Sequence, residues 1–301
     1  MIRLLVLLIS GFGLLVPDAF AWGKFGHVTI CEIADRNITL TARAELSRLM
    51  GAYPGNDSFV EACADADRNP RTRPKEHYAN YDRSLNEVTS DDCGATGKCV
   101  ISAIASDFAV LADRTEPDID RARALVLLGH WVGDIHQPLH VSFADDSGGN
   151  EIRKRGLCNA RNLHAVWDNC LVERGVFKMN AAESLFSWRR WTKAYRAADR
   201  LSKSIGDVDV TLWKQSEPWQ WAAESFDIVR TKAVGYCTMK SGACWYDETR
   251  QFLEPDGAPR TIQITQDYFD QNSPTADAQL LKAGVRLAHL INRALDPEYT
   301  F

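Results

Sequence analysis

Histidine and aspartate recur at a fixed spacing in the middle of the chain. His130 and Asp134 are four residues apart within a helical pattern, and His164 and Asp168 repeat that spacing further on. Side chains four residues apart lie on the same face of a helix. His140 follows a proline that ends the first helix and turns the chain, so this histidine can point back toward the pair. Imidazole and carboxylate groups in this pattern are typical of a metal site, and zinc binds both.

Weaker ligand candidates lie upstream, at His27, Asp65 and His77. A single histidine on an apolar helix face is more often a core residue than a ligand, so none of these is informative alone. Trp22 becomes a candidate if the mature chain begins there, because a free α-amine with a pKa of about 7.7–8.0 can bind a metal near neutral pH.

Residues 1–21 are predicted to be a signal peptide. They contain a basic residue, an apolar run and the cleavage pattern Ala19-Phe20-Ala21. The run is too short for a comfortable membrane span, and no later stretch is long and apolar enough for one. The alternative is an uncleaved anchor. We therefore expect export to the periplasm or the medium, cleavage between Ala21 and Trp22, and one mature domain over 22–301.

Eight cysteines fit an oxidising compartment, where an even number suggests disulfides. The short separations favour three pairs and leave a fourth: Cys93–Cys99, Cys158–Cys170, Cys237–Cys244 and Cys31–Cys63. The alternative is thiolate ligation of zinc, but the sequence contains no Cys-x-x-Cys motif.

The composition excludes a disordered chain and a protein with a broad basic face. The 301 residues are 45% hydrophobic and 25% charged, and the net charge is −5. Binding to long nucleic acid through many phosphate contacts is therefore not expected. Bound metal ions would supply the positive charge needed to attract a phosphate.

The periodicity predicts a mainly α protein with few or no strands and long loops over 51–99 and 140–163. No repeat or linker marks a domain boundary. The expected helices are 41–50, 100–111, 119–135, 181–205, 219–234 and 276–294.

Six motifs spread over the mature chain support a more specific interpretation. They are Trp22-Gly…Gly26-His27, Ala64-Asp65…Arg68, His77-Tyr78, Gly129-His130…Gly133-Asp134…His136-Gln-Pro138-Leu-His140, Gly148-Gly149-Asn150 and Asn162-Leu-His164…Trp167-Asp168-Asn169. With these motifs the chain resembles the zinc-dependent single-strand-specific nucleases, namely the fungal S-one and P-one type, the plant bifunctional nucleases and exported bacterial relatives. The resemblance implies a single-domain compact helical bundle of the zinc-dependent nuclease/phospholipase C type.

The same resemblance implies three Zn²⁺ per chain. The ligands it assigns are Asp65, His77, His130 and Asp134 for the first ion, His140, His164 and Asp168 for the second, and Trp22, His27 and the shared Asp134 for the third. These donors do not fill every position of three four-coordinate ions. Catalytic zinc keeps an open position whereas structural zinc is closed, so the count favours catalysis over a non-catalytic zinc-binding or adhesion protein.

The implied activity is hydrolysis of single-stranded DNA and RNA to products with 5′-phosphates, together with removal of phosphate from 3′-mononucleotides. Asp65, Arg68 and Asn169 would then be the catalytic residues, because a guanidinium and an amide can stabilise charge on the phosphoryl oxygens. No feature indicates an obligate protein partner.

A base pocket is implied around Tyr78, Asn80, Ser142 and Asn150. An aromatic ring at 78 can stack a nucleobase, which must first be unstacked, and this favours single strands. Relatives often have Phe and Asp at positions 78 and 80, so Tyr78 and Asn80 are departures that bear on base preference.

The alternative enzyme is a zinc phospholipase C, which uses a similar site on lipid phosphodiesters. Such enzymes have a longer gap after the N-terminal tryptophan and Glu as the last ligand. Here Trp22 and His27 are close, and the last ligand is Asp168. Both features favour the nuclease.

Overall fold

The computed structural model describes residues 22–93 and 97–301. The predicted signal peptide, 1–21, lies outside the described residues. Within them no helix is long and apolar enough to cross a membrane.

Helices form most of the structure, as the sequence predicts. The α-helices are α1 (Gly23–Asn37), α2 (Leu40–Met50), α3 (Phe59–Ala62), α4 (Val100–Ala112), α5 (Asp118–Ile135), α6 (Leu163–Ala165), α7 (Ser187–Ser202), α8 (Asp207–Lys214), α9 (Pro218–Val229) and α10 (Gln266–Leu295). Shorter or wider turns are η1 (Asp65–Asp67), η2 (Pro74–Glu76), η4 (Pro138–His140), η6 (Glu183–Leu185) and the π-helical η5 (Val166–Val176).

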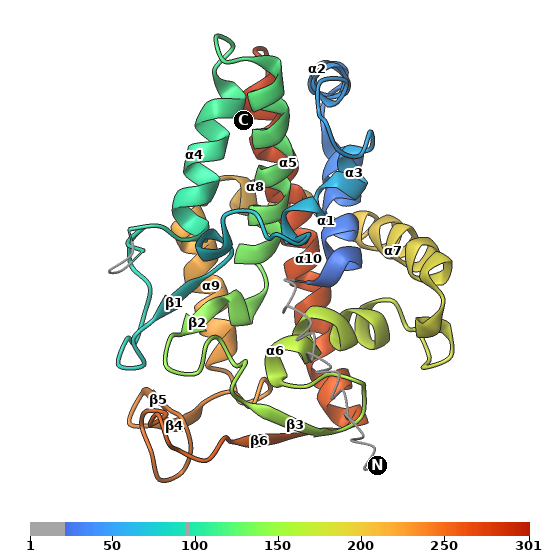
Figure 1. Cartoon of the computed structure of the whole chain (residues 1–301). Helices are drawn as coiled ribbons and strands as arrows, with labels where there is room; N and C mark the ends of the chain where they lie inside the picture. The colour runs from blue at the N-terminus through green and yellow to red at the C-terminus, as the bar shows by residue number, and fades with distance from the viewer. Residues whose placement is uncertain (1–21, 94–96) are drawn as a thin grey trace, which may run out of the picture.

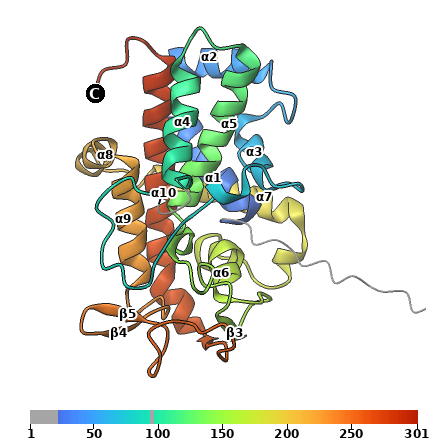
Figure 2. The ribbon, with the colours of Figure 1, turned by 60° about the vertical axis from the view of Figure 1, so that its left-hand side comes forward.

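The long helix α10 is the central helix of the bundle. It contacts α1, α5, α4 and η5, and α1 lies between it and α7 (Figure 1). Thr265 caps its start by accepting a hydrogen bond from the backbone N–H of Tyr268. Where α1 crosses α10, a Cβ on Gly284 would lie 2.4 Å from Cγ2 of Ile33, so only glycine permits this approach. The view in Figure 2 shows α4, α5 and α10 running side by side.

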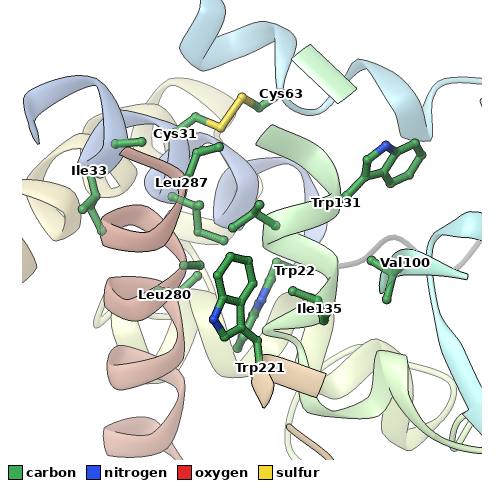
Figure 3. Packing of buried hydrophobic residues seen from close by; sticks show 14 of the residues in the cluster. Trp22, Cys31, Ile33, Cys63, Val100, Trp131, Ile135, Trp221, Leu280 and Leu287 are labelled. Carbon is green, nitrogen blue, oxygen red and sulfur yellow. A yellow bond between two sulfur atoms is a disulfide. The ribbon is translucent and has the colours of Figure 1, made fainter. Parts of the chain in front are cut away.

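Helices α1 and α5 are buried along most of their length, which explains why the sequence shows apolar residues on more than one face. The disulfide Cys31–Cys63 ties α1 to the segment after α3 and packs against α5 (Figure 3). A Cβ on Gly129 would lie 2.6 Å from Sγ of Cys63. The glycine beside His130 therefore lets the disulfide fit against α5.

All four predicted disulfides are confirmed, with Cα–Cα separations from 4.9 to 6.6 Å. They join α1 to the end of α3, Cys93 to the start of α4, Cys158 to η5 and Cys237 to β5.

The strands are short and occur in pairs. They are β1 (Ala79–Tyr81) parallel to β2 (Val141–Phe143), β3 (Arg153–Gly156) parallel to β6 (Thr261–Ile264), and β4 (Thr238–Lys240) antiparallel to β5 (Ala243–Trp245). The first pair matters most, because its register sets Ala79 beside Val141 and so brings the residues that precede each strand together.

Three predicted helices differ in extent. The stretch predicted over 219–234 is helical only to Val229, where α9 ends. The stretch predicted over 181–205 begins as η6 and becomes regular only at Ser187. The last helix starts at Gln266 rather than at 276, because Thr265 caps it and Pro274 is accommodated inside it. Proline normally ends a helix, so the sequence pattern favoured the later start.

Candidate metal centre

Three groups of buried ligand-type side chains lie close enough together to hold metal ions. They are His27, Asp67 and His130; His77, His130 and Asp134; and His140, His164 and Asp168. Helix α5 supplies His130 and Asp134, and His77 directly follows the turn η2. The other ligand-type residues come from α1, η1, η4, α6 and η5. The structure thus brings the five residues predicted from their spacing into two neighbouring groups. These residues are His130, Asp134, His140, His164 and Asp168.

Four of the imidazoles each have one ring nitrogen against a backbone carbonyl. Nδ1 of His130 is 2.7 Å from the oxygen of Cys63, and Nδ1 of His164 is 2.7 Å from that of Gly148. Nδ1 of His140 is 2.6 Å from the oxygen of His77. A carbonyl can only accept, so each ring must donate its N–H there. In a neutral ring the other nitrogen then carries a lone pair.

His77 is the opposite tautomer, but it too has one ring nitrogen donating to a backbone carbonyl and the other free to accept. Its Nε2 is 2.8 Å from the carbonyl oxygen of Thr72, which leaves Nδ1 as the acceptor. That Nδ1 is 3.1 Å from Nε2 of His130, and Nε2 of His140 is 3.1 Å from Nε2 of His164. In each pair two lone pairs face each other without a proton between them. Such a pair cannot form a hydrogen bond, but both members can bind one cation.

Carboxylate oxygens meet the same points. Oδ2 of Asp134 is 3.0 Å from Nδ1 of His77, and Oδ1 of Asp134 is 3.3 Å from Nε2 of His27. Oδ2 of Asp168 is 3.6 Å from Nε2 of His164, while Oδ1 accepts a 2.6 Å hydrogen bond from the amide of Gln137. Both oxygens of Asp134 and Oδ2 of Asp168 are buried and have no hydrogen-bond donor among the described residues. Buried acceptors without donors are what a metal site requires.

Burial sets the protonation of these rings. It lowers the pKa of His130 and His140 well below the ordinary value and that of His164 to about 4. Burial alone would raise the pKa of Asp134, but the imidazoles around it, those of His130, His27 and His77, keep it well below its usual range. The imidazoles of His130, His140 and His164 are therefore neutral at pH 7, which is the form that binds metal.

The third predicted ligand set is Trp22, His27 and Asp134. His27 and Asp134 each belong to one of the three groups, but not to the same one. His27 is fully buried, stacks on the ring of His130 at 4.0 Å between centroids, and approaches Asp134. Its position depends on Gly133, where a Cβ would lie 2.5 Å from Nδ1 of His27. Trp22 is buried at the start of α1, and its carbonyl accepts a hydrogen bond from Gly26.

Asp65 lies outside the three groups, and Asp67 lies inside one. The carboxylate of Asp65 pairs with Arg68 at 2.7 Å and accepts a hydrogen bond from Tyr53 at 3.3 Å. Asp67 is buried, with Oδ1 3.6 Å from Nδ1 of His77 and 3.7 Å from Nε2 of His130. The sequence analysis missed Asp67. Its signal is the repeat Ala64-Asp65-Ala66-Asp67, in which either aspartate fits the motif.

Two arginines follow these aspartates and face different surroundings. The Arg68 side chain is 63% exposed, whereas that of Arg71 is 22% exposed and pairs with Asp67 at 2.8 Å. The charge of Arg71 also helps to lower the pKa of His140 and His164. Arg71 therefore lies near both the first and the second group.

The remaining predicted residues occupy the surroundings of the centre. Asn169 is exposed and contacts Gly23 at the start of α1. Asn80 and Ser142 are partners across the β1–β2 pair, with Ser142 Oγ donating to Asn80 Oδ1 at 3.5 Å. Tyr78 is 38% exposed, and Asn150 donates to the carbonyl of Ser147. The structure thus brings Asn80 and Ser142 together, next to the loop that carries Asn150.

The remaining histidines take no part in the three groups. His136 donates through Nδ1 to the carbonyl of Val132 and accepts through Nε2 from Arg286 at 2.8 Å. His289 contacts Tyr299 at the end of α10.

A helical fold with three buried imidazole–carboxylate groups that could hold metal ions defines the class of protein. Comparison with known proteins identifies the family. Residues 22–296 match the family model described as S1/P1 Nuclease, and the chain belongs to this family. The resemblance inferred from the motifs is confirmed.

The named relatives are nucleases from plants and fungi. The chain is 29% identical to Endonuclease 4 of Arabidopsis thaliana, over 93% of this chain and 91% of that protein. It is 26% identical to Nuclease S1 of Aspergillus oryzae, over 89% and 90%, and 26% identical to Nuclease P1 of Penicillium citrinum, over 90% and 97%. These relatives give no support to the phospholipase alternative.

Proposed function

We propose that residues 22–301 form one exported catalytic domain, a zinc-dependent endonuclease. It cleaves single-stranded DNA and RNA to leave 5′-phosphates and also removes phosphate from 3′-mononucleotides. One observation carries the proposal: the acceptor nitrogens of four imidazoles converge in pairs on buried carboxylates, while the other ring nitrogen of each lies against a backbone carbonyl.

The donor set fits zinc, which takes neutral imidazole and carboxylate ligands and requires no thiolate. We assign Asp67, His77, His130 and Asp134 to a first ion, His140, His164 and Asp168 to a second, and Trp22, His27 and Asp134 to a third. When bound, zinc supplies Lewis acidity toward the phosphate and lowers the pKa of water.

Asp67 replaces Asp65 as the proposed zinc ligand, and Arg71 replaces Arg68 as the residue that stabilises charge on the phosphoryl oxygens. Asp67 is buried against two imidazoles, whereas Asp65 is already neutralised by Arg68. Arg71 lies near both ligand groups and can neutralise negative charge on a phosphodiester held between them.

Other side chains position the ligands and exclude water. Gln137 donates to Asp168 and fixes which oxygen faces His164. The centre is almost closed to solvent, so charge interactions inside it are stronger than in water. Asn169 and the group Tyr78, Asn80, Ser142 and Asn150 remain the candidates for contacts with the phosphate and the base.

The decisive experiment uses the mature protein, starting at Trp22, with single-stranded and duplex DNA of the same sequence. A chelator, zinc add-back and analysis of product ends run in parallel, and a 3′-mononucleotide is tested separately. Zinc-dependent loss of the single strand with 5′-phosphate ends is expected. Absence of cleavage by protein that has bound zinc would refute the nuclease proposal and direct attention to other phosphodiesters.

The ligand assignment has its own test, which does not depend on activity. Asp67→Asn should lower the zinc content per chain, whereas the matched variant Asp65→Asn should keep it. Arg71→Ala should retain zinc but lower kcat roughly 10²-fold, a larger loss than Arg68→Ala causes. The opposite order in zinc content would restore Asp65 as the ligand.

A further inference from the structure

A cavity of about 720 Å³ lies beside the metal centre, between the start of α1, η1, η5 and the segment that leads into α7. In Figure 1, α7 lies above α6. Asp67 and Asn169 are among its lining residues, so the cavity is continuous with the centre. Its volume falls within the roughly 300–1,000 Å³ typical of small-molecule sites. There is therefore room for at least one nucleotide.

This cavity is separate from the predicted base pocket. None of Tyr78, Asn80, Ser142 and Asn150 is among its lining residues in the part of the chain that the structure describes. A strand whose base entered that pocket would have to continue past the centre. The cavity offers a place for that continuation.

The charge of the lining suits a phosphate chain, although the whole protein is acidic. Arg68 pairs with Asp65, and Arg190 pairs with Glu173 at 2.7 Å, so these pairs are close to neutral. Lys24 and Arg174 also line the cavity, and neither forms a salt bridge within residues 22–93 and 97–301. Two cations without acidic partners, beside a cavity of this size, favour an anionic ligand.

Aromatic rings hold these cations in place. The ammonium of Lys24 lies 4.7 Å from the ring centroid of Trp191, and that ring meets Phe25 edge-on at 5.3 Å. The guanidinium of Arg174 lies 5.7 Å from the ring centroid of Phe269. A cation over an aromatic face keeps its charge and remains available to a phosphate.

The wall also offers surface for a base. Leu185 lines the cavity and is 80% exposed, and Trp188, at the start of α7, is 59% exposed. Asn159 and Asn169 add amide groups that can donate and accept hydrogen bonds. Apolar surface with cations and amides is the combination that single-stranded nucleic acid requires.

We propose that this cavity is a subsite for the nucleotides that continue the strand beyond the scissile phosphate. Lys24 and Arg174 bind their phosphates there. The substrate class that this enzyme prefers is then a single strand of several nucleotides rather than a dinucleotide. This inference rests on the nuclease function proposed above.

The test compares a dinucleotide with a single-stranded octanucleotide as substrates of the zinc-loaded enzyme. The variant Lys24→Ala/Arg174→Ala should raise KM for the octanucleotide about tenfold and leave kcat/KM for the dinucleotide within twofold. The slope of log KM against log salt should fall by about 1.4, since each phosphate contact on a single strand contributes about 0.7. The control Lys203→Ala/Lys214→Ala removes the same net charge at two residues that do not line the cavity and should change neither value.

Lys24→Ala could disturb the neighbouring Trp22. The zinc content of each variant and the single variant Arg174→Ala show whether it does. Arg174→Ala alone should give about half of the change in salt slope. Equal effects on both substrate lengths, or no effect on the octanucleotide, would overturn the subsite while leaving the nuclease function intact. Should the wild type cleave neither substrate, the nuclease proposal fails. Fluorescence anisotropy with a labelled octanucleotide then decides whether the cavity binds single strands.

Discussion

Gly133 is a position where a single methyl group should remove a metal ion without unfolding the protein. A Cβ at 133 would lie 2.5 Å from Nδ1 and 2.8 Å from Cε1 of His27. Ordinary contact begins near 3.4 Å, so the ring would have to move by roughly 0.9 Å. It has little room, because it is fully buried and stacked on His130 at 4.0 Å.

The expected magnitudes separate stability from metal binding. Overpacking costs about 1–3 kcal/mol, and alanine in place of glycine inside a helix returns about 1 kcal/mol. Gly133→Ala should therefore unfold at a somewhat lower temperature and still be folded at 25 °C. A metal–ligand distance tolerates only about 0.2 Å. The shift of His27 should weaken the ion that it binds by at least the roughly 10–100-fold typical of disturbed ligand support.

The assay is zinc per chain by atomic emission, with affinity from chelator competition and stability from thermal unfolding. Gly284→Ala is the matched control, since its Cβ would meet Ile33 at 2.4 Å inside another buried helix. It should lower the melting temperature but keep all zinc. Full zinc content with unchanged affinity in folded Gly133→Ala would refute the assignment of His27 as a ligand.

Three further outcomes are expected. Chelation should lower the melting temperature strongly, because zinc present at a thousandfold over its Kd stabilises the native state by about 4 kcal/mol; an unchanged melting temperature would mean that no ion is bound. Replacing Cys31 and Cys63 by serine opens a loop with a sequence separation of 32 and should cost about 3–4 kcal/mol in the free energy of unfolding, measured with urea. Burial and Arg286 lower the pKa of His136 to about 3 in the folded protein. Below about pH 6.5 the unfolded chain therefore binds a proton there that the folded protein does not bind. The free energy of unfolding should then decrease as the pH is lowered from 6.5 toward 3. His136→Gln should lose stability less steeply over that range than the wild type, by up to about 1.4 kcal/mol per pH unit, and parallel profiles would contradict this.

The part of the site that the sequence predicts is the part set by local geometry. His130 and Asp134 share a helix face through their spacing, and His164 and Asp168 do so in the same way. The disulfide pairs were also accessible, because the short separations left one long pair. Periodicity and spacing are local properties, so a single sequence is enough to detect them.

What the sequence did not resolve depends on contacts between distant segments. The choice between Asp65 and Asp67 is made by η1, a single tight turn that directs one carboxylate toward Tyr53 and the other toward His77. The tautomers depend on carbonyls such as that of Cys63, which reaches His130 only because a disulfide holds its segment against α5. Neither contact leaves a pattern along the chain.

These contacts also explain how an acidic protein can bind an acidic substrate. Each buried carboxylate of the centre lies against imidazoles or, for Asp67, against Arg71, and none of them faces solvent. Of the cations that line the cavity beside the centre, Lys24 and Arg174 form no salt bridge within residues 22–93 and 97–301. Attraction for phosphate is therefore short-ranged at ordinary salt, where charges further than about 8–10 Å apart are screened. The proposed substrate, a single strand, is thin and flexible enough to bring its phosphates within that distance.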